Sequence, residues 1–245
     1  MGESAAARQA TSLSADDVEF ARGLVIFEDA DILALNKPAG LSSQGGRIRA
    51  LTLDALLGAF AKPSGVKPRL VHRLDRDTSG VILTARSQPA AAFLGKAMMS
   101  RRIFKTYLAI VAPGAPEPPT GAVETSLARQ EVGREAYVRV VQSDAPGAQA
   151  AYTRYRTLAA DDRAALVELS PRTGRMHQLR VHMASISRPI AGDARYGGAL
   201  VLAGHPVGRL MLHAKALSFP HPSGGERRIE APVPSDMQAF ILRIG

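Results

Sequence analysis

Short apolar runs separated by turn-forming residues dominate the first part of the chain. Residues 24–27 and 32–35 are two such runs, and the acidic residues between them predict a β-hairpin. Apolar residues at helical spacing predict a helix over about 52–60, which begins at Thr52 as its N-cap, and a second helix over 88–101. The pattern therefore mixes both kinds of element from the start.

A stretch rich in Pro and Gly, residues 112–121, interrupts this pattern. Strands come first after it and helices follow at irregular places, which indicates an α+β fold with a largely antiparallel mixed sheet and flanking helices. The strands are predicted over 136–141, 151–158 and 164–169, and the helices over 176–187 and 236–243.

Charged residues are concentrated between two apolar runs that end at Val71 and begin at Val81. We expect a loop there, held by two buried strands, and loops so placed commonly carry function. Asp75 lies at its centre between Arg73 and Arg76, whose charges favour an ionised carboxylate that can act as nucleophile or general base. From the charges alone a structural ion pair is the commoner arrangement, and it stays open here.

Composition narrows the class of protein. The 245 residues include 31 Lys and Arg against 22 Asp and Glu, and the net charge of +9 suits a polyanionic partner. The absence of cysteine excludes disulfides, thiolate catalysis and zinc sites built from cysteine. No stretch has the apolar length of a signal peptide or a membrane span, so we expect a cytoplasmic protein without membrane contact.

Histidine and aspartate raise the possibility of a metal-dependent nuclease, with Asp75 and Asp77 as its acidic pair. The histidines do not form the i, i+4 pair of a His-Glu-x-x-His motif, and no cysteine completes a tetrahedral site. We therefore expect no metal. The histidines concerned are His72, His177, His182 and His213.

Residues 72–80 read His-Arg-Leu-Asp-Arg-Asp-Thr-Ser-Gly, which resembles the His-Arg-Leu-Asp-x-x-Thr-Ser-Gly signature of the RluA-type pseudouridine synthases. Further segments resemble this family in the same order along the chain, and the resemblance covers about residues 24 to 242. These segments are 32–40, 105–109, 173–182, 192–197 and 212–214.

The resemblance implies isomerisation of a uridine in RNA to pseudouridine on a catalytic fold whose active-site cleft crosses the sheet. The bond from the sugar to N1 is broken and C5 is joined to C1′, so no atom is gained or lost and no cofactor is implied. Asp75 is then the catalytic residue, and Arg180 pairs with it. Tyr107 lies against the uracil and is the candidate for removing the C5 proton. Whether Asp75 attacks C1′, attacks C6 or removes a sugar proton stays open. For Tyr107 the alternative is an aromatic residue of the sheet core.

A stacked base must leave the RNA to reach such a carboxylate. Arg73 is the residue expected to fill the space left behind, because a guanidinium can stack on bases and bond to phosphate. His177 is expected to hydrogen-bond to backbone or substrate, as is His72. The cations expected to contact phosphates are Lys37, Arg76, Arg101, Arg102 and Arg175.

The N-terminal region differs from that of larger family members, some of which carry a small RNA-binding domain of the S4 type. We expect a flexible tail over residues 1–20 and one catalytic domain over 21–245. Ribosomal RNA is the first expected substrate and transfer RNA the second, and an RNA-binding protein without catalysis is an alternative of a different class. A monomer is expected.

Overall fold

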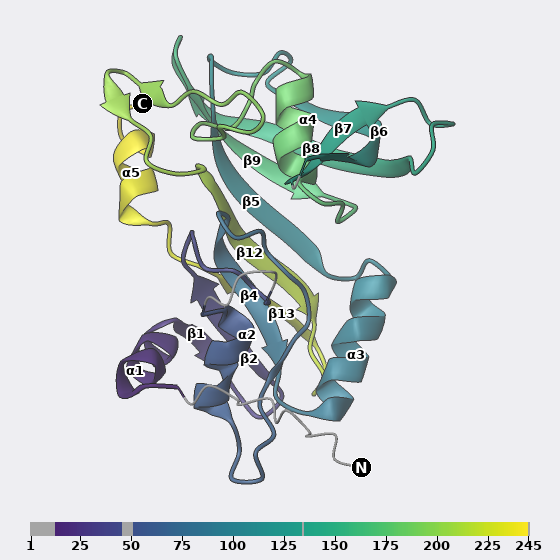
Figure 1. Ribbon diagram of the computed structural model, residues 1–245, viewed down its shortest axis with the longest axis vertical. Coiled ribbons are helices and arrows are strands. Elements are labelled where there is room, and N and C mark those ends of the chain that lie inside the picture. Colours follow the sequence, from purple (N-terminus) through teal and green to yellow (C-terminus); the bar gives the residue numbers. More distant parts are fainter. Residues whose placement is uncertain (1–12, 46–50, 134, 245) are drawn as a thin grey trace, which may run out of the picture.

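One mixed sheet runs through the length of the molecule (Figure 1). The computed structural model describes residues 13–45, 51–133 and 135–244. The strands are β1 (Val25–Glu28), β2 (Ile32–Lys37), β3 (Arg69–Leu70), β4 (Ser79–Ala85), β5 (Phe104–Val111), β6 (Thr120–Val132), β7 (Glu135–Val141), β8 (Gln149–Ala160), β9 (Ala165–Pro171), β10 (Val201–Leu202), β11 (His205–Pro206), β12 (Leu212–Pro220) and β13 (Glu226–Glu230).

The sheet order is β1-β2-β4-β12-β5-β9-β8-β6-β7, with β3 added to β4 and β13 to β12, while β10 and β11 form a separate hairpin. Among the described strands, β4 and β12 pair in parallel and all other neighbours pair antiparallel. The largely antiparallel mixed sheet predicted from the sequence is therefore confirmed, as is the hairpin of β1 and β2.

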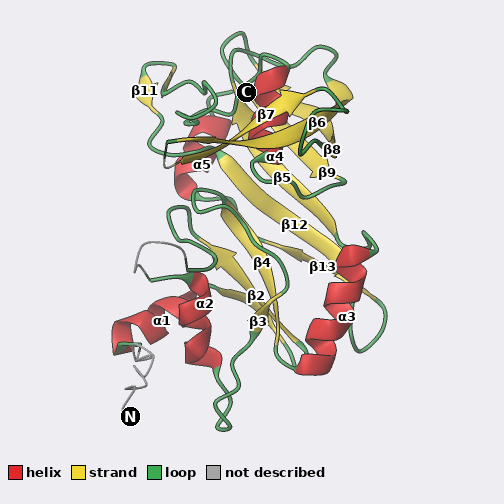
Figure 2. Cartoon of the chain, turned by 45° about the vertical axis from the view of Figure 1, so that its right-hand side comes forward, coloured by secondary structure: helices red, strands yellow, loops and turns green. Residues whose placement is uncertain are grey.

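The helices flank the sheet (Figures 1 and 2). The first three helices along the chain lie beside the lower half of the sheet, and the fourth packs on β6, β7 and β8 in the upper half. They are α1 (Ala15–Gly23), α2 (Leu53–Leu56), α3 (Gln88–Met99), α4 (Gln178–Ser185) and α5 (Ser235–Ile241), and a 3-10 turn over Leu57–Phe60 continues α2.

Side-chain caps explain where several helices begin. Thr52 accepts a hydrogen bond from the backbone N of Ala55, as predicted, and Ser87 caps α3 in the same way through Ala90. Ser14 and Asp17 form a reciprocal capping box at the start of α1. Residues 15–20 are thus helical, and the prediction of a flexible tail is wrong for them. Residues 1–12 of that tail lie outside the described residues.

Six of the described strands were not predicted from the sequence. They are β10, β11 and β13, which are short, and the longer β5, β6 and β12. In β6, Val123 and Leu127 are buried while most of its other described side chains are partly or fully exposed. Strands β5 and β12 contain polar residues among the apolar ones, although both lie in the middle of the sheet.

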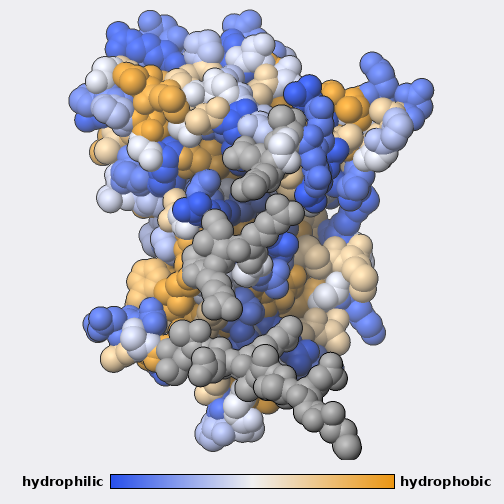
Figure 3. Space-filling view, viewed as in Figure 1, coloured by the Kyte–Doolittle hydropathy of each residue, from blue (hydrophilic) through white to orange (hydrophobic). Residues whose placement is uncertain are grey.

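The surface is mixed in character. In Figure 3, hydrophilic side chains gather along the upper edge of this face, and hydrophobic ones show near α1 and β1. Among the described helices, none is long and apolar enough to cross a membrane.

The register of the central strands links the expected catalytic loop to Tyr107. Gly80 of β4 lies opposite Ala214 of β12, and Ala214 lies opposite Tyr107 of β5. On the other side of Gly80, Lys37 of β2 lies opposite it in an antiparallel pair. Since adjacent strands are about 4.8 Å apart, this row sets the lateral distance between the loop before β4 and the side chain of Tyr107.

Gly80 is required in this row. Its φ is +116°, and a Cβ at this position would lie 2.2 Å from the carbonyl oxygen of Ala214. No side chain fits between the two backbones, which explains the Ser-Gly that ends the motif of residues 72–80.

We predict that Gly80→Ala lowers the free energy of unfolding by about 3 kcal/mol or more, because it adds a backbone clash to a strained φ. Gly95 is the matched control: it lies inside α3 with nothing within 4 Å of an added Cβ. Gly95→Ala should leave stability unchanged or raise it by up to about 1 kcal/mol. Urea denaturation of both variants tests this, and equal stabilities would contradict the required close approach.

Candidate active site

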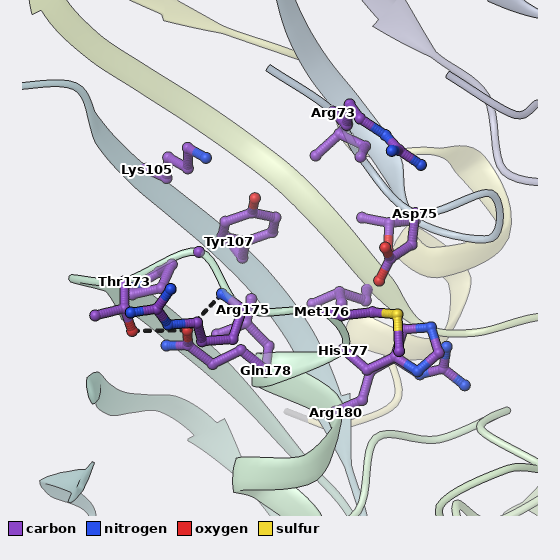
Figure 4. A pocket seen from close by; sticks show the side chains of 16 residues that line it. Arg73, Asp75, Lys105, Tyr107, Thr173, Arg175, Met176, His177, Gln178 and Arg180 are labelled. Carbon is purple, nitrogen blue, oxygen red and sulfur yellow. Dashed lines mark hydrogen bonds between the residues drawn. The ribbon is translucent and has the colours of Figure 1, made fainter. Parts of the chain in front are cut away.

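A cavity of about 300 Å³ lies between the loop before β4, strand β5 and the turn that leads into α4 (Figure 4). Asp75, Tyr107 and Arg180, the three predicted catalytic residues, all line it. They come from three separate segments of the chain. The structure therefore brings together the residues that the resemblance assigned to one site.

Asp75 is half-buried and faces the cavity (Figure 4). Its carboxylate makes no hydrogen bond or ion pair with another described residue. The flanking Arg76 instead lies 4.0 Å from Asp77. A structural ion pair of Asp75 with its arginine neighbours, the alternative left open by the sequence, is therefore wrong.

The backbone on both sides of Asp75 is held in place. The Ser43 hydroxyl donates to the carbonyl of Leu74 (2.7 Å) and accepts from its N–H (3.1 Å). After Asp75, the carbonyl of Arg76 accepts from the N–H of Gly40 (2.9 Å). Asp75 itself accepts at its carbonyl from the N–H of Thr78. The carboxylate is thus free to react while its backbone is fixed.

Lys37 is part of this support. Its side chain is completely buried, and Nζ donates to the carbonyls of Pro38, Leu41 and Arg76 at 2.8 to 2.9 Å. Burial lowers its pKa to about 8, against the opposing charges of Asp77 and Asp75. The prediction that Lys37 contacts phosphate is therefore wrong, because all its donors are used inside the protein.

His72 has a structural role in the same loop. Its Nε2 accepts from the backbone N–H of Leu83 (3.1 Å), which confirms the expected bond to backbone. Burial lowers its pKa to about 3, and the charge of Lys105 acts in the same direction. The ring is thus neutral and joins the loop to β4.

Tyr107 projects from β5 into the cavity and is 8% exposed (Figure 4). Burial raises the pKa of its hydroxyl, and the negative charge of Asp75 raises it further. Tyr107 is therefore a neutral phenol. The sheet-core alternative is too simple, because the ring belongs to the core and also lines the cavity.

Arg180 has a different partner from the one predicted. Its Nε and Nη2 donate to the two carboxylate oxygens of Asp193, each at 2.7 Å, and the Asp193 side chain is 1% exposed. Burial lowers the pKa of Arg180, but Asp193, and more weakly Asp75, raise it above its usual value. Direct pairing with Asp75 is thus wrong: Arg180 acts on Asp75 through charge at longer range.

Tyr196 was not assigned a role from the sequence, although its segment belongs to the family resemblance. The guanidinium of Arg180 lies 5.0 Å from the centre of its ring. Its hydroxyl accepts from the N–H of Val138 (3.0 Å) and lies 2.8 Å from Nδ1 of His177. Nδ1 of His177 therefore bonds to the side chain of Tyr196, where a bond to backbone or substrate was expected.

Gln178 was also missed, and it fixes the turn that closes the cavity. Its Oε1 accepts from the Thr173 hydroxyl (2.7 Å) and from the N–H of Arg175 (3.1 Å). Its Nε2 donates to the carbonyl of Tyr152 and to the Thr153 hydroxyl. The turn before α4 is thereby tied to strand β8.

Comparison with known proteins decides the family. Residues 31–185 match the family model of RNA pseudouridylate synthases. The chain belongs to this family.

Named relatives agree. The chain is 38% identical over 229 residues to ribosomal large subunit pseudouridine synthase C of Escherichia coli (strain K12), covering 90% of this chain and 70% of that protein. It is 36% identical over 220 residues to the uncharacterized RNA pseudouridine synthase YhcT of Bacillus subtilis (strain 168), covering 87% of this chain and 70% of that one. The chain is therefore a pseudouridine synthase, an isomerase.

Solved structures show the same fold. Human RNA pseudouridylate synthase domain containing 4 aligns with a TM-score of 0.77 and 26% identity over 94% of this chain and 97% of that one. Human RNA pseudouridylate synthase domain containing 1 aligns with a TM-score of 0.69 and 26% identity over 90% and 94%. The pseudouridine-synthase fold expected from the resemblance is confirmed.

The arginines predicted to contact RNA lie in different places around the synthase cavity. Arg73 and Arg175 line it, and the side chain of Arg73 bonds to no other described residue. Arg76 donates to the carbonyl of Gly40, and Arg102 lies 3.9 Å from Glu226. Arg101 lines a neighbouring groove. Their contacts with RNA stay predictions.

The metal alternative gains no support from the arrangement of side chains. Within residues 13–45, 51–133 and 135–244, no group of three or more His, Asp or Glu side chains is placed to hold a metal ion. His182 instead bonds through both ring nitrogens to the hydroxyls of Thr153 and Thr125. Nδ1 of His213 lies 2.9 Å from the Ser79 hydroxyl.

Buried histidines predict how the stability of the synthase depends on pH. Burial lowers the pKa of His182 and His213 to about 4 and that of His72 to about 3. As pH falls below about 6.5, the unfolded chain takes up protons before the folded one, so stability is lost. Each histidine should remove about 2 kcal/mol from the free energy of unfolding between pH 7 and pH 5.

Urea denaturation at several pH values between 5 and 7 measures this slope. His182→Gln should reduce it by about a third, since one of three such histidines is removed. A free energy of unfolding that is the same at pH 5 and pH 7 would contradict the neutral, buried state of these rings.

Proposed function

We propose that this synthase isomerises uridine in large-subunit ribosomal RNA, with Asp75 as its catalytic residue. The main support is the position of the Asp75 carboxylate, which faces the cavity and forms no ion pair with any described residue. The backbone around it is held by hydrogen bonds at Leu74 and Arg76. The choice of RNA is supported by the relatives named as large-subunit synthases. Transfer RNA, the alternative substrate, has no observation in its favour.

The geometry supports a division of roles. The extruded uridine enters the cavity with its ring against Tyr107 and its sugar near Asp75. Because Tyr107 is a neutral phenol, we assign it to holding the uracil during rotation rather than to strong base catalysis. The positive charge of Arg180, fixed by Asp193, lies near the negative charge of Asp75 without occupying its oxygens.

We also propose that residues 21–245 form the catalytic domain, supported by one sheet that contains all the described strands except the β10–β11 hairpin. The monomeric state and the cytoplasmic location stay predictions.

Asp75→Asn is expected to lower the rate of pseudouridine formation on an unmodified large-subunit ribosomal RNA transcript by about a thousandfold or more, because the reacting carboxylate is lost. RNA binding and the melting temperature should stay close to those of the wild type. Asp77→Asn is the matched control, since Asp77 is exposed and does not line the cavity. Turnover by Asp75→Asn at the control's rate would refute the assignment.

Arg73→Ala is expected to lower the single-turnover rate by about tenfold or more, since one stacking contact contributes about 1–3 kcal/mol. The melting temperature should change little, because Arg73 is exposed and unpaired among the described residues. Arg73→Lys keeps the charge but not the planar group, and it should restore binding more than rate. An unchanged rate for Arg73→Ala would show that Arg73 does not fill the space that the extruded uridine leaves in the RNA.

A further inference from the structure

A second, larger groove of about 880 Å³ opens beside the catalytic cavity. The two share wall residues, among them Arg73, Lys105 and Arg175 (Figure 4). The groove continues from there to the end of α3 and the start of β5. A strand of RNA whose nucleotide enters the cavity must leave it across one of the neighbouring surfaces, and this groove is continuous with it.

The charge of the groove is of one sign. Its wall holds five cationic side chains and no Asp or Glu. The cations are Arg73, Arg101, Lys105, Arg172 and Arg175. Such a surface suits a chain of phosphates.

An exposed aromatic ring lies within this cationic wall. Phe104, the first residue of β5, is 51% exposed, and the guanidinium of Arg172 lies 5.6 Å from the centre of its ring. An exposed Phe is unfavourable in water, but a ring beside an arginine offers a flat surface on which a base can stack. The combination of cations and a stacking ring is typical of grooves that bind single-stranded nucleic acid.

Arg101 is held toward this groove by the turn after α3. It has a φ of +57°, which non-glycine residues rarely adopt, and the N–H groups of Arg101 and Arg102 bond to the carbonyls of Met98 and Ala97. Glycine is the usual residue at such a helix end. Arg101 thus occupies a turn in which its side chain lines the groove although glycine would suit the backbone better.

We propose that this groove binds the unpaired RNA next to the target uridine, with one base stacked on Phe104 and Arg172 and with phosphates near Arg101. The inference rests on the proposed function for the identity of the natural RNA, but not for the stacking itself. The catalytic domain would thus recognise the RNA next to the target uridine through this groove on its own surface.

Binding of a fluorescent twelve-residue oligouridylate, measured by anisotropy on the full chain, tests the groove without depending on turnover. Phe104→Ala should weaken binding by about tenfold, and Phe104→Tyr should restore it, because stacking needs the ring. Arg101→Gly should weaken binding and reduce the slope of log affinity against log salt by about 0.7. The same variant should melt at an equal or higher temperature, since it relieves the positive φ.

Arg163→Gln is the control for the loss of one positive charge, because Arg163 is exposed in the turn between β8 and β9, away from both cavities. Its affinity should equal that of the wild type. Unchanged binding by both Phe104→Ala and Arg101→Gly would overturn the proposal. Equal competition by polyglutamate would also overturn it, because the groove would then bind any polyanion.

Activity on the ribosomal transcript separates the two proposals. If the groove holds the neighbouring strand, Phe104→Ala raises KM by about tenfold and leaves kcat unchanged at saturating RNA. Oligouridylate binding that depends on Phe104, together with no turnover of the transcript by the wild type, would reject the ribosomal substrate and keep the groove. If Phe104→Ala turns over the transcript with the KM of the wild type and binds oligouridylate equally well, the groove is rejected and the ribosomal substrate is retained.

Discussion

The close approach of β4 and β12 at Gly80 and Ala214 is the constraint on which the site depends. It is the parallel contact in an otherwise antiparallel set of described strands, and no side chain fits there. The same row continues to Tyr107, so the loop that carries Asp75 is set beside the ring. The catalytic arrangement is thus a consequence of strand register, supported by short hydrogen bonds around Leu74 and Arg76.

Two buried cations surround Asp75 without pairing with it. Lys37 is bound to backbone carbonyls and Arg180 to Asp193, yet the charge of Asp75 influences the pKa of both. Such an arrangement keeps positive charge near the carboxylate while leaving its oxygens available to the substrate. A direct ion pair would give similar charge stabilisation but would have to break before reaction.

The sequence predicted the parts of the molecule that local patterns determine. The hairpin of β1 and β2, the cap at Thr52, the helix α3, and the cavity residues Asp75, Tyr107 and Arg180 followed from periodicity and motif. The sequence could not predict interactions between distant segments. Burial of Lys37 depends on three carbonyls that lie near one another only after folding, and the partner of Arg180 lies 13 residues away in an irregular loop.

The most direct test is a crystal structure of Asp75→Asn bound to an RNA stem-loop that the wild type modifies. The account predicts that the target uridine is extruded into the cavity, with its ring against Tyr107 and its sugar beside the side chain at position 75. A uridine that stays stacked in the RNA, or one bound with its sugar turned away from position 75, would contradict it.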